Sequence, residues 1–181
     1  LAPGLDSDAL VGAVRYWAAK VDDARHTLSL ARTAAAHGAR MATSTRVLEI
    51  STPGGQVDGV HVRDLEGGVD RFIPARAVIS AAGVWTDDIQ ELAGDSGIDV
   101  RASKGIHLVV LRDRIRSGSG LILRTDKSVL FVIPWYDHWI VGTTDTPWSL
   151  GRAHPAASRE DIAYLLRWAN TVLSVPLAPE D

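Results

Sequence analysis

The first half of the chain combines one helical pattern with several short stretches that have the period of β-strands. Residues 24–36 are mostly small or straight-chain, with Asp22 or Asp23 as an N-cap and Gly38 after the end, which predicts a helix. The apolar positions that share one face at helical spacing are Ala24, Leu28, Ala31 and Ala35. Residues 11–20, before this helix, mix apolar and aromatic side chains and indicate a strand or an extended segment.

A β-meander is predicted after this helix, because apolar and polar residues alternate between short glycine-containing turns. The strands are expected at residues 41–50, 57–63 and 69–73, with turns at 52–55 and 66–68. Residues 75–82 are small and apolar, which indicates a buried strand. Thr86 then begins a short helix that Gly94 ends.

The second half is richer in strand patterns and ends in a helix. Apolar stretches predict strands at residues 106–111, 121–124, 129–135 and 139–144, the last two joined by a hairpin turn at 136–138. Ser158 opens the final helix, and Asp161 three residues later completes a capping signature. Because helices and strands do not alternate regularly, the order of elements indicates an α+β (mixed α/β) fold class.

Composition excludes several classes of protein. With 46% hydrophobic and 23% charged residues among 181, the chain resembles a globular domain. A formal net charge of −3 without a dense basic cluster argues against binding of nucleic acid. The absence of cysteine excludes disulfides, thiol catalysis and cysteine-bound zinc. No apolar run suits a transmembrane helix and no secretory leader pattern is visible, so we expect a cytoplasmic location.

One candidate ligand site is the segment Ala81-Ala82-Gly83-Val84-Trp85, at the end of the predicted buried strand. Small residues allow a ligand to approach the backbone closely, and a helix N-terminus favours an anion such as a pyrophosphate. A tight strand-to-helix turn that binds nothing has the same pattern. The residues alone leave both interpretations open.

Two further candidates lie in the second half. His107 stands at the entrance of a predicted strand, where a histidine serves as a general base or as a satisfied sheet residue. Lys104 is a candidate phosphate contact or an ordinary surface lysine. Thr144 and Asp145 bring a hydroxyl and a carboxylate together at a strand end, where local turn hydrogen bonds are the alternative. The histidines lack paired metal-ligand spacing, so we predict no metal site.

Five short motifs follow one another along the chain. They are Val14-Arg15-Tyr16-Trp17 with Val21-Asp22-Asp23-Ala24-Arg25, Ala81-Ala82-Gly83-Val84-Trp85, Lys104-Gly105-Ile106-His107, Phe131-Val132-Ile133-Pro134-Trp135 and Ile140-Val141-Gly142-Thr143-Thr144-Asp145. In this order they resemble the middle of the FAD-dependent glycerol-3-phosphate dehydrogenases, which are D-amino-acid-oxidase-like flavoproteins. The resemblance runs from about Gly12 to about Val175 and covers nearly the whole chain.

The resemblance implies a set of residues that contact FAD. Val47 matches the segment beside the adenine and would contact it through its backbone. Ala81, Ala82 and Gly83 match a segment close to the FAD phosphates and ribose, and Trp85 completes that motif. These assignments imply that the first half of the chain contributes to an FAD-binding domain.

The resemblance also implies a reaction and its substrate-side residues. His107 matches a histidine near the flavin and the substrate, and it would remove the hydroxyl proton or hydrogen-bond to the hydroxyl. Lys104, Thr144 and Asp145 are implied on the same side. The reaction would oxidise glycerol 3-phosphate to dihydroxyacetone phosphate by hydride transfer to FAD, with electrons passed to a membrane quinone.

Two motifs of the family are missing from this chain. The glycine-rich dinucleotide fingerprint does not occur, and neither does the later glycine-arginine-proline motif, so no phosphate-binding arginine is assigned. We therefore expect a central fragment of such an enzyme, inactive by itself and able to self-associate through exposed sheet edges. Residues 1–99 would belong to the FAD-binding domain with its meander, residues 100–157 to the antiparallel sheet of the substrate domain, and residues 158–181 to a helix and tail.

Two alternatives of different classes stay open at this point. One is another flavin oxidase of the same superfamily that acts on an amine or an amino acid. The other is a binding module without catalysis. The family's intact enzymes sit on the inner membrane surface, but no basic amphipathic helix stands out here, so the sequence leaves membrane contact open.

Overall fold

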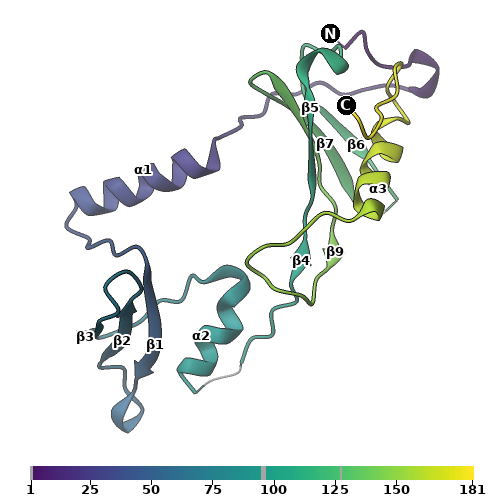
Figure 1. Ribbon diagram of the computed structural model, residues 1–181. Coiled ribbons are helices and arrows are strands. Elements are labelled where there is room, and N and C mark those ends of the chain that lie inside the picture. The colour runs from purple at the N-terminus through teal and green to yellow at the C-terminus, as the bar shows by residue number, and fades with distance from the viewer. Residues whose placement is uncertain (1, 95–96, 127) are drawn as a thin grey trace. The chain divides into compact units, whose positions relative to one another are not determined.

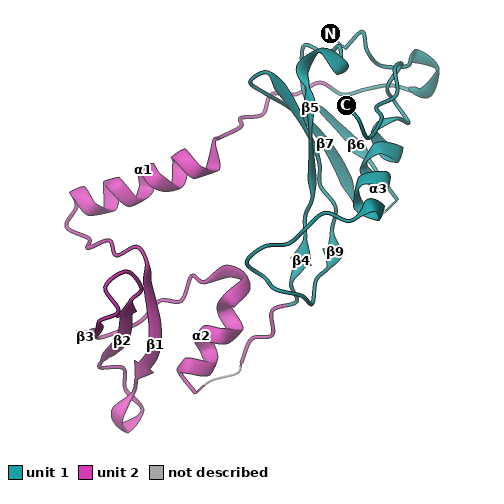
Figure 2. Cartoon of the chain, viewed as in Figure 1, with its two compact units in different colours: residues 1–14, 101–181 teal, residues 15–100 magenta. Residues whose placement is uncertain are grey.

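The computed structural model describes residues 2–94, 97–126 and 128–181 (Figure 1). The chain divides into two compact units (Figure 2). Unit 1 comprises Leu1–Val14 and Arg101–Asp181, and unit 2 comprises Arg15–Val100. The prediction of an α+β fold is confirmed, because both units combine helices with antiparallel strands.

Unit 1 is built on a four-stranded antiparallel sheet with the strand order β5-β8-β7-β6. Its strands are β5 (His107–Leu111), β6 (Leu121–Arg124), β7 (Val129–Trp135) and β8 (His138–Gly142). The short strands β4 (Ser103–Lys104) and β9 (Thr146–Pro147) form a second antiparallel pair. Helix α3 (Arg159–Ala169) begins at the N-cap Ser158, where the predicted capping box with Asp161 is confirmed.

The core of unit 1 lies between one face of this sheet and α3. Successive side chains of a strand point to opposite faces, so every second residue contributes to this core. Its largest fully buried side chains are Trp139, Leu130, Leu165, Val132 and Val141. The N-terminus belongs to the same unit, because Leu5 forms an antiparallel bridge with Leu173 and the Gly4 N–H donates to the Arg116 carbonyl at 2.7 Å.

The opposite face of the four-stranded sheet is largely apolar but only partly covered among the described residues. We call it the open face, and its members are His107, Val109, Leu111, Ile122, Arg124, Val129, Phe131, Ile133, Trp135, His138 and Ile140. The exposed fraction is 65% for Val109 and 47% for Ile122. The register fixes this membership, because His107 pairs with Gly142 and Gly142 with Phe131.

Unit 2 contains the predicted meander and two helices. Its elements are α1 (Asp23–Ala36), β1 (Thr45–Ser51), β2 (Gly59–Asp64), β3 (Asp70–Pro74) and α2 (Thr86–Leu92). The strand order is β1-β2-β3, with antiparallel neighbours. Strand β1 begins later than predicted, directly after Ser44, whose φ of 50° interrupts an extended backbone.

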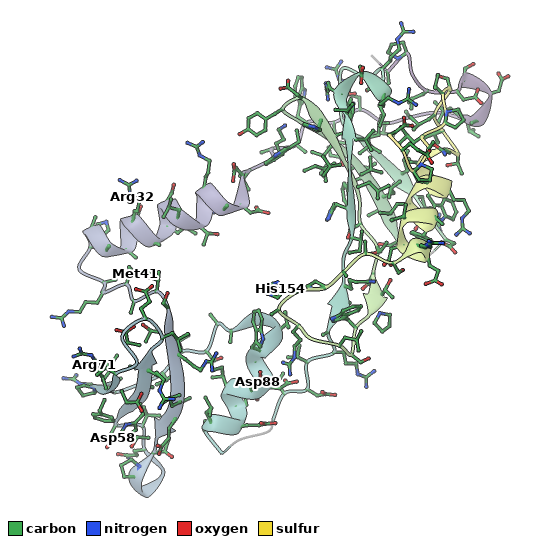
Figure 3. The ribbon with its side chains drawn as sticks, viewed as in Figure 1. Arg32, Met41, Asp58, Arg71, Asp88 and His154 are labelled. Carbon is green, nitrogen blue, oxygen red and sulfur yellow. The ribbon has the colours of Figure 1, made fainter. Side chains whose placement is uncertain are left out.

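Burial in unit 2 is sparse. Among the described residues, the only buried apolar side chains of this unit are Ile50 and Val62. Helix α1 has no buried residue, and its predicted apolar face is open, with Leu28 58% exposed. Charged side chains surround the same elements, for example Arg32 on α1 and Arg71 on β3 (Figure 3).

The prediction of a buried strand at residues 75–82 is wrong. This segment has no regular secondary structure, and Ile79 is 92% exposed. A strand needs a neighbour to pair its backbone groups, and the ladder with β2 ends at Pro74. Residues 11–20 form no strand either and correspond to the extended alternative, with Val11, Val14 and Trp17 exposed.

Candidate functional site

His107 occupies a position on the open face that Gly142 makes possible. The two residues are paired across β5 and β8. A Cβ atom built on Gly142 would lie only 2.5 Å from Cδ2 and 2.9 Å from Cγ of His107. The imidazole therefore lies directly against the bare Cα of Gly142, and any side chain at position 142 would displace it. Glycine at this position therefore leaves the room that the imidazole occupies.

The hydroxyl of Thr144 forms hydrogen bonds with two backbone groups just before His107. This hydroxyl accepts a hydrogen bond from the Ile106 N–H at 2.9 Å and donates one to the Lys104 carbonyl at 3.2 Å. Thr144 is buried, so these bonds are shielded from water. Gly105 lies between the two bonded residues, and a Cβ there would come within 2.7 Å of Thr143 Oγ1. The segment that carries His107 is thus held in one backbone arrangement.

Lys104 is buried in unit 1, with only 4% of its surface exposed. Its ammonium donates to Asp161 Oδ2 at 2.5 Å and to the Ala156 carbonyl at 3.1 Å, and it lies 4.8 Å from the centre of the Trp148 ring. These contacts occupy the ammonium within the chain. A direct substrate contact of Lys104 stays a prediction, and the present contacts do not favour it.

Asp161 is the anionic partner of Lys104 at the start of α3. Its Oδ2 also accepts from the Ser158 N–H at 2.8 Å and from the Ser158 hydroxyl at 2.9 Å. Burial acts to raise the pKa of Asp161, but the hydrogen bonds from Lys104 and Ser158 outweigh it and place the pKa below its ordinary value. The carboxyl is therefore ionised at neutral pH.

Asp145 follows Thr144 in the sequence, and β5, which begins at His107, is an edge strand of the four-stranded sheet. Asp145 is exposed, directly after the buried Thr144. A hollow of about 370 Å³ lies elsewhere, at Val57 and Pro74 in unit 2, whereas one of about 210 Å³ lies beside β5 between His107 and Ile162. The second hollow is smaller than the pockets of about 300–1,000 Å³ that usually hold small molecules. The open face, where Val109 is 65% exposed, is a second surface next to His107.

The residues assigned to FAD all lie in unit 2. Val47 lies on the edge strand β1 and pairs with Val62 of β2. The register between the two strands shifts between Val47 and Glu49. Among the described residues, β1 has a strand neighbour on one side only, so backbone groups on its other side are available to a ligand.

Residues 81–85 form a turn that leads into α2, as predicted, although no strand precedes it. Gly83 has a φ of 57°, which favours glycine, and a Cβ at this position would meet no other atom within 4 Å. The Thr86 hydroxyl donates to the Gly83 carbonyl at 2.7 Å and fixes the turn. Ala81, Gly83 and Trp85 are exposed, so this small-residue turn fits the close approach of a flat or anionic cofactor such as FAD.

The predicted site residues divide into two groups, one in each unit. His107, Lys104, Thr144 and Asp145 belong to unit 1, whereas Val47, Ala81, Ala82, Gly83 and Trp85 belong to unit 2. Among the described residues there is no cluster of histidine and carboxylate groups that could hold a metal ion. Sequence reasoning missed Gly142 and Asp161 as site residues. The sequence signals were the glycine two residues before Thr144 and the capping signature at Ser158.

Comparison with known proteins gives one consistent result. Residues 1–180 match the family model of the FAD dependent oxidoreductases. The chain is 53% identical to a glycerol-3-phosphate dehydrogenase of Mycobacterium leprae over 182 aligned positions, which cover 100% of this chain and 31% of that protein. It is 33% identical to the human mitochondrial glycerol-3-phosphate dehydrogenase, over 95% of this chain and 25% of that protein.

A solved structure is similar to most of this chain. It is the glycerol-3-phosphate dehydrogenase of Bacillus halodurans in complex with FAD, with a TM-score of 0.83 and 32% sequence identity over 90% of this chain and 34% of that one. The chain thus spans about a third of the length of the Mycobacterium leprae and Bacillus halodurans proteins. The match to the family model over residues 1–180 places this chain in the family of FAD-dependent oxidoreductases.

Proposed function

We propose that this chain forms the central part of an enzyme that oxidises glycerol 3-phosphate to dihydroxyacetone phosphate with FAD. The observation that carries the proposal is the placement of His107 against Gly142 on the open face, within a motif that resembles one of the glycerol-3-phosphate dehydrogenases. The names of the similar proteins support the same substrate. Family membership supports FAD as the cofactor.

In the proposed chemistry, His107 accepts one proton from the substrate. Oxidation of the secondary alcohol breaks one C–H bond and one O–H bond and forms the carbonyl. The imidazole accepts the hydroxyl proton, since a neutral histidine is a suitable base near neutral pH. When bound, FAD supplies the two-electron acceptor that takes the hydride from the same carbon.

The neighbours of His107 have supporting roles in this proposal. The apolar side chains of the open face, such as Val109 and Phe131, would exclude water beside the reacting alcohol. Thr144 holds the preceding backbone, and Asp145 offers an exposed carboxylate on the substrate side. In unit 2, Val47 would contact the adenine, and the turn at 81–85 would lie near the FAD phosphates and ribose.

Several properties of the intact enzyme follow as further proposals. Electrons would leave the flavin for a membrane quinone, so the enzyme would lie in the cytoplasm or on the inner membrane surface. Among the described residues, no helix has the length and apolar character needed to cross a bilayer. The isolated chain would bind FAD weakly, would not turn over, and would self-associate through exposed apolar surface such as Val109 and Ile79.

The test is anaerobic reduction of the flavin in the FAD-loaded polypeptide that contains this chain. Glycerol 3-phosphate should bleach the oxidised flavin spectrum, whereas a D-amino acid or a secondary amine should not. His107→Asn should slow this reduction by about 100-fold or more, as expected when a general base is lost. His26→Asn, on the exposed helix α1, is the matched control and should leave the rate unchanged.

Each result decides between the classes of function. Reduction by an amine or amino acid instead would favour the other flavin oxidases. A polypeptide that binds no flavin would favour a binding module. Equal rates for His107→Asn and His26→Asn would remove His107 from the chemistry while leaving the substrate assignment in place.

A further inference from the structure

The buried ion pair between Lys104 and Asp161 has no part in the chemistry proposed above. Both side chains are almost fully buried, with exposed fractions of 4% and 5%. The partners are 57 residues apart in sequence, so the pair joins the β4 strand to the first turn of α3. Burial of such a pair is unfavourable in free energy, because both charges lose their hydration. The presence of the pair therefore needs an explanation.

A gain in the stability of the folded chain does not by itself explain the buried pair. Well-packed apolar side chains of similar volume often replace a buried ion pair without loss of stability. An ion pair differs from apolar packing in that it permits few geometries. The ammonium of Lys104 is directed by the Asp161 carboxylate, by the Ala156 carbonyl and by the Trp148 ring. The carboxylate is directed in turn by two hydrogen bonds from Ser158.

A short piece of backbone connects the pair to His107, and hydrogen bonds hold this backbone at several points. Lys104 is paired with Thr146 across β4 and β9, and the Asp161 carboxylate also accepts from the Thr146 hydroxyl at 3.4 Å. The Lys104 carbonyl and the Ile106 N–H are bonded to one hydroxyl, that of Thr144. His107 is the next residue along the chain.

We propose that Lys104 and Asp161 are positioning residues for His107: their buried ion pair anchors the 104–106 backbone to α3 and so fixes the imidazole against Gly142. Its relevance to catalysis rests on the proposed function, but the anchoring itself is a property of the chain. Lys104 is then a structural anchor rather than a substrate contact. The ion pair acts through the backbone and does not touch the reacting atoms.

The test replaces the pair by a neutral one of similar shape, Lys104→Met with Asp161→Asn. The asparagine keeps an amide oxygen for the Ser158 N–H, so the capping of α3 is retained. The matched control is Arg63→Met with Asp70→Asn, which removes an ion pair whose side chains are 49% and 51% exposed. Lys104→Arg is a third variant, which keeps the charge but moves its position.

The first readout needs no cofactor. The ring signals of His107 are recorded by NMR in the full 181-residue chain with labelled histidine, and His107→Asn identifies them. In the Lys104→Met/Asp161→Asn variant the His107 signal should shift and broaden, while the signals of the core of unit 1 stay dispersed. The control variant should leave the His107 signal in place. An unchanged His107 signal in a folded Lys104→Met/Asp161→Asn chain would overturn the proposal.

Lys104→Arg covers the case in which the neutral variant does not fold. This substitution should shift the His107 signal from its position in the wild-type chain, and an unchanged signal would likewise overturn the anchoring role. In the FAD-loaded enzyme, the neutral pair should lower kcat by about 10- to 100-fold, because small misplacements of a catalytic group are costly. KM should change by less than about threefold. If even the wild-type enzyme does not oxidise glycerol 3-phosphate, the proposed function is wrong. The NMR result still shows whether the ion pair anchors His107.

Discussion

The two units of this chain bury their apolar side chains to different degrees. Unit 1 surrounds Trp139, Leu130 and Leu165 completely between a four-stranded sheet and α3. Unit 2 has a regular meander and two helices, yet Ile50 and Val62 are its only buried apolar residues within the described chain. Regular secondary structure and a hydrophobic core are therefore separable properties here. Hydrogen-bonded strands alone contribute little net stability compared with buried apolar surface.

The difference also separates the two kinds of candidate residue. The proposed base His107 stands on a sheet whose other face is firmly packed, so its position is determined by the chain itself. The residues proposed for FAD lie on exposed turns and an edge strand, with Trp85 46% exposed. Binding of a cofactor would order such residues at the expense of binding energy. The proposed base is therefore preorganised, whereas the proposed cofactor contacts are not.

The largest expected effect is the loss of the central side chain of unit 1. Trp139 is 0% exposed, its indole N–H donates to the Arg112 carbonyl at 3.0 Å, and its ring lies 3.9 Å from the Arg112 guanidinium carbon. Trp139→Ala should lower the free energy of unfolding of unit 1 by about 3–5 kcal/mol. Urea titration followed by the amide NMR signals of each unit measures this loss. Trp17→Ala, at a side chain that is 89% exposed, is the control and should change stability by less than about 0.5 kcal/mol.

Acid should affect unit 1 through Asp161. Because hydrogen bonds hold the pKa of Asp161 in the folded chain below the ordinary 3.8, its contribution to stability is fully present above pH 3.8 and is lost as the pH falls through the lower folded value. Protonation would also leave the buried Lys104 ammonium without its counter-charge. Urea midpoints of unit 1 between pH 5 and pH 2, in steps of about half a unit, measure the loss. The Lys104→Met/Asp161→Asn variant should show a flatter pH dependence, and an equally steep one would contradict the assignment.

A pair of identical substitutions compares the two units directly. Val110 in unit 1 and Val62 in unit 2 are 3% and 5% exposed. Valine to alanine removes two methyl groups at about 0.8 kcal/mol each, or about 1.6 kcal/mol in either unit. Val110→Ala should leave unit 1 folded, because its core contains many other side chains. Val62→Ala should increase amide exchange throughout β1–β3, because Ile50 alone remains buried there. Equal protection of the two units in both variants would contradict the difference in core size.

The helix caps allow a smaller comparison. Ser158 caps α3, where its hydroxyl accepts from the Asp161 N–H at 3.2 Å, and Asp22 caps α1, where its carboxylate accepts from the Arg25 N–H at 3.1 Å. Ser158→Ala should lower the stability of unit 1 by about 1 kcal/mol, because α3 is part of the core. Asp22→Ala removes an equivalent bond but should reduce only the helicity of α1, which has no buried residue. Circular dichroism and urea titration together separate the two outcomes.

Local signals in the sequence predicted much of this structure. Both caps, the strands 121–124 and 129–135 with the observed bounds, and the meander follow from residues within a few positions of one another. Capping, turns and strand alternation are short-range effects, so the sequence pattern contains them directly.

Long-range contacts could not be predicted in the same way. The Leu5–Leu173 bridge attaches the N-terminus to unit 1, and the Lys104–Asp161 pair joins residues far apart in sequence. No local pattern specifies such a partner. Residues 75–82 show that a local pattern can also mislead. Their apolar composition suits a buried strand, but no described strand pairs with them. In the candidate site, His107 and Thr144 could be selected from the sequence because of their residue types. The contact between the His107 imidazole and the Cα of Gly142 could not be predicted.

The smallest expected effect concerns the Arg63–Asp70 ion pair on the meander. Two hydrogen bonds of 2.6 Å and 2.7 Å from Arg63 place the pKa of Asp70 below its ordinary value of 3.8. Since both side chains are about half exposed, water screens the attraction, and Arg63→Gln should not measurably change the stability of unit 2. The pKa of Asp70, followed by carboxyl NMR, should nevertheless rise toward 3.8 in this variant. A loss of stability that disappears in 1 M salt would show instead that unit 2, with its small core of Ile50 and Val62, depends on its surface charges.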